Sequence, residues 1–153
     1  MSFFELIQKG DLERIIALTN ADANLILTKD TRGFTPLIFA TYSGQYEITK
    51  FLLDQGAAVN GTDASGNTAL MGVCFKGDKA LAELLLGYDA SVNISNIKGS
   101  TALIYAATFG QTEITKLLLA KGADKLVKDN TGKTALTYAH DKGNKDLIDL
   151  LQD

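Results

Sequence analysis

The chain of 153 residues is built on a period of 33 residues, and no other feature restricts its fold as strongly. Four sets of residues recur at this spacing and in the same phase: Gly33, Gly66, Gly99 and Gly132; Thr35, Thr68, Thr101 and Thr134; Leu37, Leu70, Leu103 and Leu136; Gly44, Gly77, Gly110 and Gly143. A period of this length is typical of stacked repeat proteins, in which each unit buries its apolar face against its neighbours. The sequence therefore predicts a solenoid.

Each period predicts a turn followed by two helices. Residues 30–33 (DTRG) suit a tight turn, with Asp first and Gly last. Thr35-Pro36 suits the start of a helix, because Thr can cap it and Pro fits the first helical position. Apolar residues then recur at helical spacing in residues 37–42 and 48–53, and a glycine follows each of these segments. We expect Ala57–Asn60 to run extended towards the next turn.

The period divides the chain into about five repeats, of which the first and the last are degenerate. We expect one domain over residues 1–153, with units at 2–29, 30–62, 63–95, 96–128 and 129–153. Ser2 and Glu5 have the spacing of a capping box, so a short helix should run to about Lys9. In the third unit, Gly72 lies inside the first predicted helix, where glycine costs roughly 1 kcal/mol relative to alanine. The last helix, near residues 144–152, has a polar side that suits a terminal cap.

The residues of the second unit resemble the ankyrin repeat. The resemblance rests on Asp30-x-x-Gly33-x-Thr35-Pro36-Leu37, Gly44-x-x-Glu47-Ile48 and Leu52-Leu53-x-x-Gly56-Ala57-x-Val59-Asn60. It extends over nearly all of the chain and implies an all-α solenoid of helix-turn-helix units joined by β-hairpin-like turns. It also implies that the first helices and the turns lie on the concave side. The family's usual histidine is replaced by Ile38, Met71, Ile104 and Thr137, so we expect apolar packing there.

The residue types that carry catalysis or bind metals are scarce and scattered. Cys74 and His140 are the only cysteine and histidine, and they occupy equivalent positions two units apart. A metal site needs three or four ligands together, and a nucleophile needs its base within hydrogen-bond reach. We therefore expect both to be packing residues, and we predict no catalytic residues, no metal, no cofactor and no enzymatic activity.

Composition narrows the choice of partner. The net charge is −3 and no basic stripe is present, which argues against nucleic-acid binding. No apolar run has the length of a membrane span, and no secretory signal is evident. A single cysteine excludes a disulfide framework. We expect a cytoplasmic monomer that binds another protein and neither nucleic acid nor membrane.

The variable positions at the turn tips and at the ends of the first helices are the usual partner contacts in the family that the chain resembles. They carry aromatic and basic residues, the composition of a binding hot spot. The predicted partner-binding patch consists of Arg32, Phe34, Tyr42, Phe75, Lys76, Lys98 and Phe109. We expect Phe34 and Tyr42 on the surface, whereas Phe75 and Phe109 could equally pack between units.

The predicted function is a non-catalytic protein–protein interaction module that binds a partner on its concave face and scaffolds or regulates it. Two alternatives remain open. A small-ligand-binding protein or enzyme accessory would need a pocket with converging polar groups. A self-associating structural protein would be contradicted by light scattering that shows a monomer at high concentration.

Overall fold

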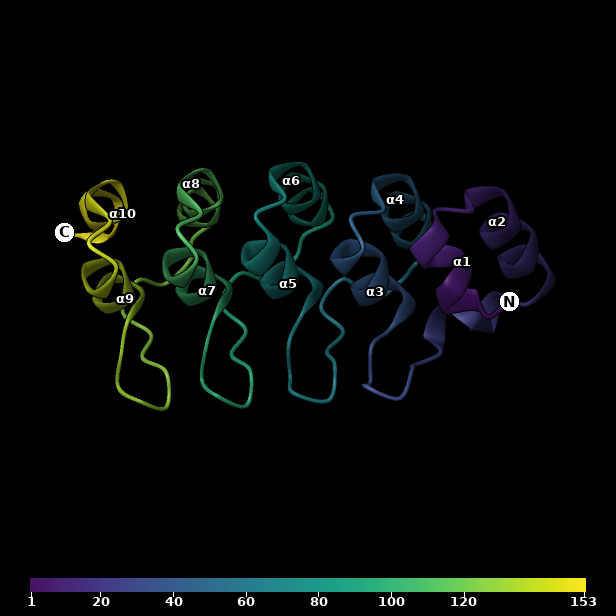
Figure 1. Ribbon diagram of the computed structural model, residues 1–153, viewed down its shortest axis with the longest axis horizontal. Helices are drawn as coiled ribbons and strands as arrows, with labels where there is room; N and C mark the ends of the chain where they lie inside the picture. The colour runs from purple at the N-terminus through teal and green to yellow at the C-terminus, as the bar shows by residue number, and fades with distance from the viewer.

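The computed structural model describes all residues from Met1 to Asp153 and shows a row of five helix pairs (Figure 1). The α-helices are α1 (Phe3–Lys9), α2 (Leu12–Ala21), α3 (Pro36–Tyr42), α4 (Tyr46–Asp54), α5 (Ala69–Lys76), α6 (Lys79–Gly87), α7 (Ala102–Thr108), α8 (Thr112–Ala120), α9 (Ala135–Asp141) and α10 (Lys145–Leu151). A 3₁₀-helix, η1 (Ala23–Leu27), follows the first pair. The predicted all-α solenoid is confirmed. None of the helices combines the length and the apolar character needed to cross a membrane.

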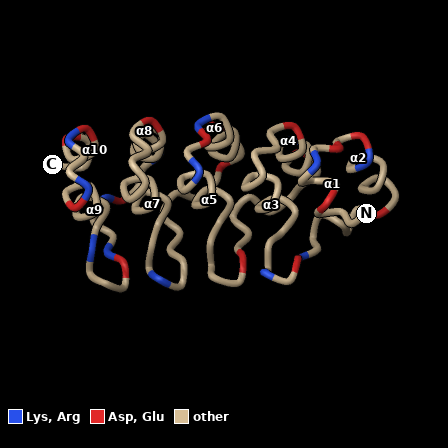
Figure 2. Tube along the Cα trace, viewed as in Figure 1, with Lys and Arg blue, Asp and Glu red and all other residues tan.

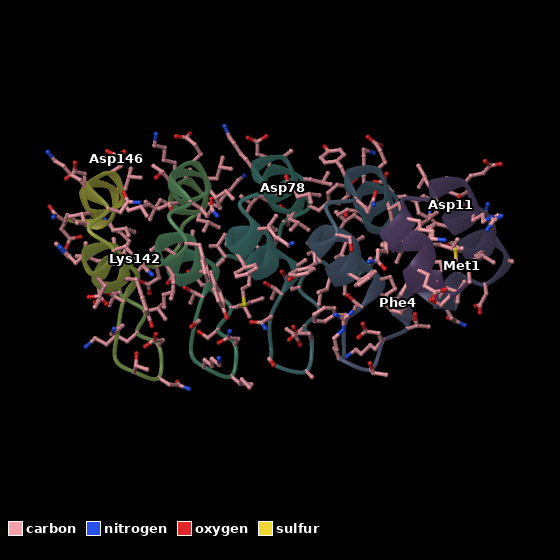
Figure 3. The ribbon with its side chains drawn as sticks, viewed as in Figure 1. Met1, Phe4, Asp11, Asp78, Lys142 and Asp146 are labelled. Atoms are coloured by element: carbon pink, nitrogen blue, oxygen red, sulfur yellow. The ribbon has the colours of Figure 1, made fainter.

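The pairs stack in two rows (Figure 1). One row contains the first helices α1, α3, α5, α7 and α9, and long turns project from it; the second row contains α2, α4, α6, α8 and α10. Neighbouring first helices contact one another more extensively than neighbouring second helices do. Small buried residues such as Ala40, Ala106 and Ala139 allow this close approach, while Leu52, Leu85 and Leu118 fill the space between the second helices. Side chains occupy the gaps between pairs throughout the row (Figure 3).

The first helices begin where the sequence predicts, because polar caps satisfy their first backbone N–H groups. The Thr35 hydroxyl accepts a hydrogen bond from the Ile38 N–H at 3.1 Å, and the equivalent threonines cap α5, α7 and α9 in the same way. At the N-terminus the predicted capping box between Ser2 and Glu5 is present. The three inner second helices are followed by a positive-φ residue: Gly56 after α4, Gly122 after α8 and Asp89, with φ of 63°, after α6.

The long turns repeat one hydrogen-bonding pattern. The Asp63 N–H donates to the Asn67 carbonyl at 3.0 Å, while Asp63 Oδ1 accepts from the N–H groups of Ser65 and Asn67, both at 2.9 Å. Asp30, Asn96 and Asp129 make the equivalent bonds. These turns are therefore hairpin-like without forming a sheet, and the only β pairing is an isolated bridge between Thr62 and Thr68. The pattern explains why every turn begins with Asp or Asn, whose side chain can bond the backbone locally.

Two local predictions are wrong. Ala57–Asn60 is not an extended arm, because Gly61 donates to the Ala58 carbonyl at 3.1 Å and closes a turn. This turn lets Asn60 Oδ1 accept from the Ser91 N–H of the next unit at 2.8 Å. His140 is exposed rather than packed, because it lies in the last unit and no further helix pair covers it.

Cys74 is a packing residue, as predicted. It is fully buried in α5, and this burial raises the pKa of its thiol to about 12. A thiol in such surroundings is chemically inert, because the thiolate is the reactive form.

Candidate functional site

A cleft of about 310 Å³ lies along the first helices α3, α5 and α7. The central helix α5 contributes Ala69, Met71, Gly72 and Phe75 to its lining. Four predicted site residues lie in this cleft: Phe34, Tyr42, Phe75 and Phe109. Sequence positions that are far apart are thus brought into one surface by the stacking of three consecutive units.

The aromatic rings of the cleft contact one another, both within a unit and across a unit boundary. The ring centres of Phe75 and Phe109 are 4.8 Å apart in an edge-to-face arrangement, and those of Phe34 and Tyr42 are 6.4 Å apart. Tyr42, Phe75 and Phe109 nevertheless remain 41%, 45% and 43% exposed, while Phe34 is half-buried. Both alternatives for Phe75 and Phe109 therefore hold in part: the rings pack between units and also present surface.

Two basic side chains lie over rings of the same surface. The Arg32 guanidinium is 4.3 Å from the centre of the Phe34 ring and pairs with Asp30 at 2.8 Å. Lys76 Nζ is 4.4 Å from the centre of the Tyr42 ring. Such cation–π contacts hold the rings and the charges in place before any ligand arrives.

Burial raises the pKa of the Asp30 carboxyl, but hydrogen bonds from Arg32 and from the Phe34 and Arg32 N–H groups outweigh it and lower this pKa below its ordinary value. The carboxylate that positions Arg32 therefore keeps its charge at neutral pH.

Six of the seven predicted residues thus form one group, which we call the cleft surface: Arg32, Phe34, Tyr42, Phe75, Lys76 and Phe109. Lys98 does not join it. This residue lies exposed at the next turn, where its carbonyl accepts the Asn130 N–H at 2.9 Å.

Sequence reasoning missed the centre of the cleft. The sequence pattern marks Gly72 only as a helix-weakening residue and gives Tyr105 no role, yet both line the cavity. The sequence does contain an indication of this cavity. When the units are aligned at the 33-residue period, Gly72 falls in the same column as Phe39, Tyr105 and Tyr138. One unit therefore lacks an aromatic ring that the units on either side of it possess.

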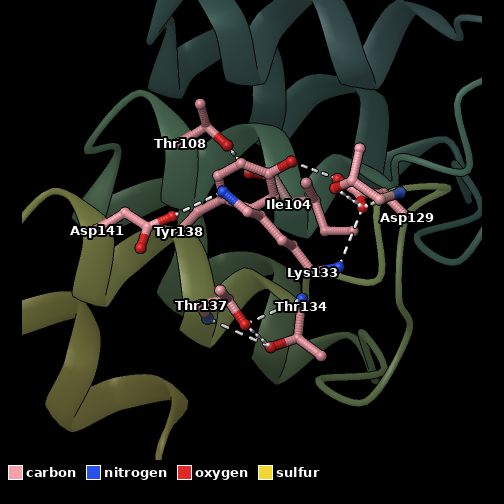
Figure 4. A network of polar contacts seen from close by, with 9 residues as sticks. Ile104, Thr108, Asp129, Lys133, Thr134, Thr137, Tyr138 and Asp141 are labelled. Atoms are coloured by element: carbon pink, nitrogen blue, oxygen red, sulfur yellow. Dashed lines mark hydrogen bonds and ion pairs between the residues drawn. The ribbon is translucent and has the colours of Figure 1, made fainter.

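The intact form of this column is visible at Tyr138 (Figure 4). The Tyr138 hydroxyl donates to Asp129 Oδ2, while the Thr131 hydroxyl donates to Asp129 Oδ1 at 2.6 Å. Burial raises the pKa of Asp129, but these bonds and the N–H groups of Lys133 and Thr131 outweigh it and lower the pKa to about 2. Asp129 therefore joins the turn of the last unit to its first helix.

This network predicts a pH dependence of stability. Because the folded-state pKa of Asp129, about 2, lies below its ordinary value of 3.8, the unfolded chain takes up a proton first as pH falls. The contribution of Asp129 is complete above about pH 5 and disappears as pH falls towards about 2. We expect a loss of about 1–2 kcal/mol from this residue over that range, after allowing for its contact with solvent.

The measurement is urea denaturation at several pH values for the wild type and for Asp129→Asn. The variant keeps the turn, as the natural Asn96 does, but cannot titrate. Its stability should fall less steeply between about pH 5 and pH 2. Identical slopes for the two proteins would contradict the assignment.

The remaining polar side chains form no recognisable reaction centre. No group of three or more His, Cys, Asp or Glu side chains is gathered so that it could hold a metal ion. The cleft surface provides aromatic rings and two cations, and the lining of the cleft adds the carboxylate of Asp63 and the amide of Asn67. Such an arrangement can bind an apolar or aromatic group and a few hydrogen-bonding atoms.

Comparison with known proteins identifies the class. The family described as "Ankyrin repeats (3 copies)" matches residues 3–96 and 70–153, and the chain therefore belongs to the ankyrin repeat family. Proteins of this family are generally protein–protein interaction modules and are typically not enzymes.

One curated relative is the human protein named DNA-binding protein RFXANK, with 39% identity over 57 residues. That alignment covers 37% of this chain and 22% of the relative, so the chain spans less than a quarter of that protein's length.

Proposed function

We propose that this chain is a non-catalytic protein-interaction module that holds a partner protein on its concave face, formed by the turn tips and first helices, and thereby scaffolds or regulates it. The observation that carries the proposal is the cleft surface. Its exposed rings and its two cations come from three units and lie close together. The residues that recur every 33 positions and build the fold do not require these residue types. Aromatic and arginine side chains around a concave centre are characteristic of binding hot spots.

The surface is also pre-organised. Ring–ring contacts and cation–π contacts already restrict Phe34, Tyr42 and Lys76 in the free protein. A partner would therefore lose less side-chain entropy on binding than it would at a surface of mobile side chains. In this proposal residues 1–153 form one domain. The cleft surface is built from three consecutive units, so it exists only when these units are stacked on one another.

The distribution of charge favours a protein partner. Both acidic and basic residues occur among the turns and among the second helices, and no stretch of the chain is basic throughout (Figure 2). Phosphate backbones bind to clustered Lys and Arg, which this arrangement lacks. DNA binding is stated in the name of the human relative, but the alignment covers only 22% of that protein's length, so the name carries no argument for DNA binding by this chain.

The test is capture of a partner from the source cells, followed by measurement of its affinity for single variants. Tyr42→Ala and Phe34→Ala should each weaken binding at least tenfold, because hot-spot truncations cost about 2 kcal/mol or more. Tyr46→Ala is the matched control: Tyr46 lies in α4 of the other row and is 40% exposed, against 41% for Tyr42. It should change the affinity less than about twofold.

Equal affinities for folded Tyr42→Ala and Tyr46→Ala would reject the proposed surface. Circular dichroism melting curves of all three variants provide the check that the fold is intact.

The cavity also gives some support to a small-ligand-binding protein or enzyme accessory, since 310 Å³ is at the lower end of the range of about 300–1,000 Å³ for ligand pockets. Native mass spectrometry of freshly isolated protein distinguishes this case, because a small bound molecule would add a discrete mass. A self-associating structural protein would instead show a mass that grows with concentration in light scattering, whereas we propose a monomer.

A further inference from the structure

The cleft lies beside a unit that lacks a ring. At the fourth position of the first helix, α5 has Gly72, whereas α3, α7 and α9 have the aromatic residues Phe39, Tyr105 and Tyr138. A Cβ atom built on Gly72 would meet no atom within 4 Å, and its backbone is ordinary helix. The position is therefore open space at the side of α5 that faces the cavity.

The tyrosines of this column have a constant hydrogen-bond partner, the residue nine places earlier that begins the turn. Tyr138 donates to Asp129 Oδ2 (Figure 4), and the Tyr105 oxygen accepts from Asn96 Nδ2 at 2.9 Å. In the unit of Phe39, which has no hydroxyl, the carboxylate of Asp30 is instead bonded by Arg32. Asp30, Asn96 and Asp129 thus each have a partner for the side-chain atom that does not hold the turn.

Asp63 is the turn residue of the unit with the missing ring, and it lines the cleft. Its Oδ1 atom holds the turn, but its Oδ2 atom accepts only a long bond, 3.3 Å, from Asn67 Nδ2. A carboxylate oxygen can accept two hydrogen bonds, so Oδ2 can take a further donor. By analogy with Asp129, that donor is a phenolic hydroxyl.

We propose that the cleft binds the side chain of a tyrosine supplied by the partner protein. The ring fills the space beside Gly72, between Tyr42 and Tyr105, and the hydroxyl donates to Asp63 Oδ2. The partner thereby completes the column of rings that this chain leaves open. The inference rests on the proposed function and names the group that the partner inserts.

The chemistry of the walls supports this occupant over others. Tyr42, Phe75 and Phe109 offer ring edges and faces, which favour an aromatic guest over an aliphatic one. A carboxylate guest would meet the charge of Asp63, and a guest without a donor would leave Oδ2 without its second bond.

The first experiment uses p-cresol, the side chain of tyrosine, as the probe. Titration into ¹⁵N-labelled protein should shift the amide signals of Asn67, Met71 and Gly72, with millimolar affinity. The matched probe 4-methylanisole has the same ring, but its oxygen cannot donate, and it should bind about tenfold more weakly. Equal affinities, or shifts confined to other residues, would overturn the assignment of a phenolic guest.

Asp63→Asn changes the acceptor while keeping the turn, since Asn96 makes the same backbone bonds naturally. The variant presents a donor where Oδ2 stood, as Asn96 does to Tyr105. The preference for p-cresol over 4-methylanisole should fall from about tenfold to less than about twofold. An unchanged preference would show that Asp63 does not receive the hydroxyl.

Gly72→Tyr supplies the missing ring from the chain itself. It should abolish p-cresol binding, weaken the captured partner at least tenfold and raise the melting temperature, whereas Gly72→Ala should leave both affinities within about twofold. Loss of partner binding in Tyr42→Ala, but not in a folded Gly72→Tyr, would retain the proposed function and reject tyrosine insertion. Insensitivity of the partner to both substitutions would reject both.

Discussion

Truncation of Leu118 to alanine is expected to lower the free energy of unfolding by roughly 2–5 kcal/mol. Leu118 lies in α8 and is completely buried. Its helix contacts both α6 and α10, so the side chain belongs to an interior unit of the stack. Removal of three carbon atoms there loses their burial and leaves a cavity that helices held on both sides cannot close. Urea denaturation followed by circular dichroism measures the effect.

Leu126→Ala is the matched control for this prediction. Leu126 follows the same helix pair but is 75% exposed. Its truncation should change the stability by no more than about 0.5 kcal/mol, as is usual for surface positions. Similar losses for the two variants would contradict the register of the repeat.

Substitution of Gly33 by alanine is expected to cost roughly 2–4 kcal/mol, from two separate causes. Gly33 has a φ of +79°, where an L-residue is strained by about 1–2 kcal/mol. A Cβ atom there would also lie 2.7 Å from the backbone nitrogen of Ala64 in the next turn. Relief of this contact would have to separate two stacked turns, because the clashing atom belongs to the backbone.

Gly132→Ala separates the two causes. Gly132 has nearly the same φ, +82°, but a Cβ atom there meets nothing within 4 Å, because no turn follows that of the last unit. Its cost should be limited to the backbone strain of about 1–2 kcal/mol. If chemical denaturation gives the same loss for both glycines, then neighbouring turn tips do not contact in solution as they do in the structure.

Much of the fold could be predicted because its determinants are local and repeated. Thr35 and Pro36 specify a helix start by their own geometry, and the equivalent threonines mark α5, α7 and α9. The capping box of Ser2 and Glu5 is likewise contained within four residues. Repetition at a constant period then adds the information that the units stack.

The predictions that failed depend on what lies next to a residue in space. His140 and Cys74 occupy equivalent positions, yet only Cys74 is covered, because first helices pack on both sides of α5 and only on one side of α9. The segment Ala57–Asn60 turns because Asn60 reaches Ser91, which is 31 residues away. The residue pattern of a single unit predicts neither which helices cover a residue nor a hydrogen bond to the next unit.

The site was predicted as a set of residue types, but its shape was not. Arg32, Phe34 and Tyr42 stand out in the sequence because they do not recur, whereas Gly72 appears there only as a weak point in a helix. Its role emerges only when the missing ring and the carboxylate of Asp63 are seen on the same cavity. Lys98 resembles Lys76 in sequence context, but the stack places it at a turn tip away from the rings.

We propose that a protein partner binds to the first-helix row and its turns. The decisive measurement maps the amide signals of the ¹⁵N-labelled chain that change when the captured partner is added. The largest changes should fall in α3, α5 and α7 and in the turns that precede them, with Gly72 among them, while α4, α6 and α8 remain nearly unchanged. Changes concentrated in the second-helix row, with the cleft surface unaffected, would contradict the claim.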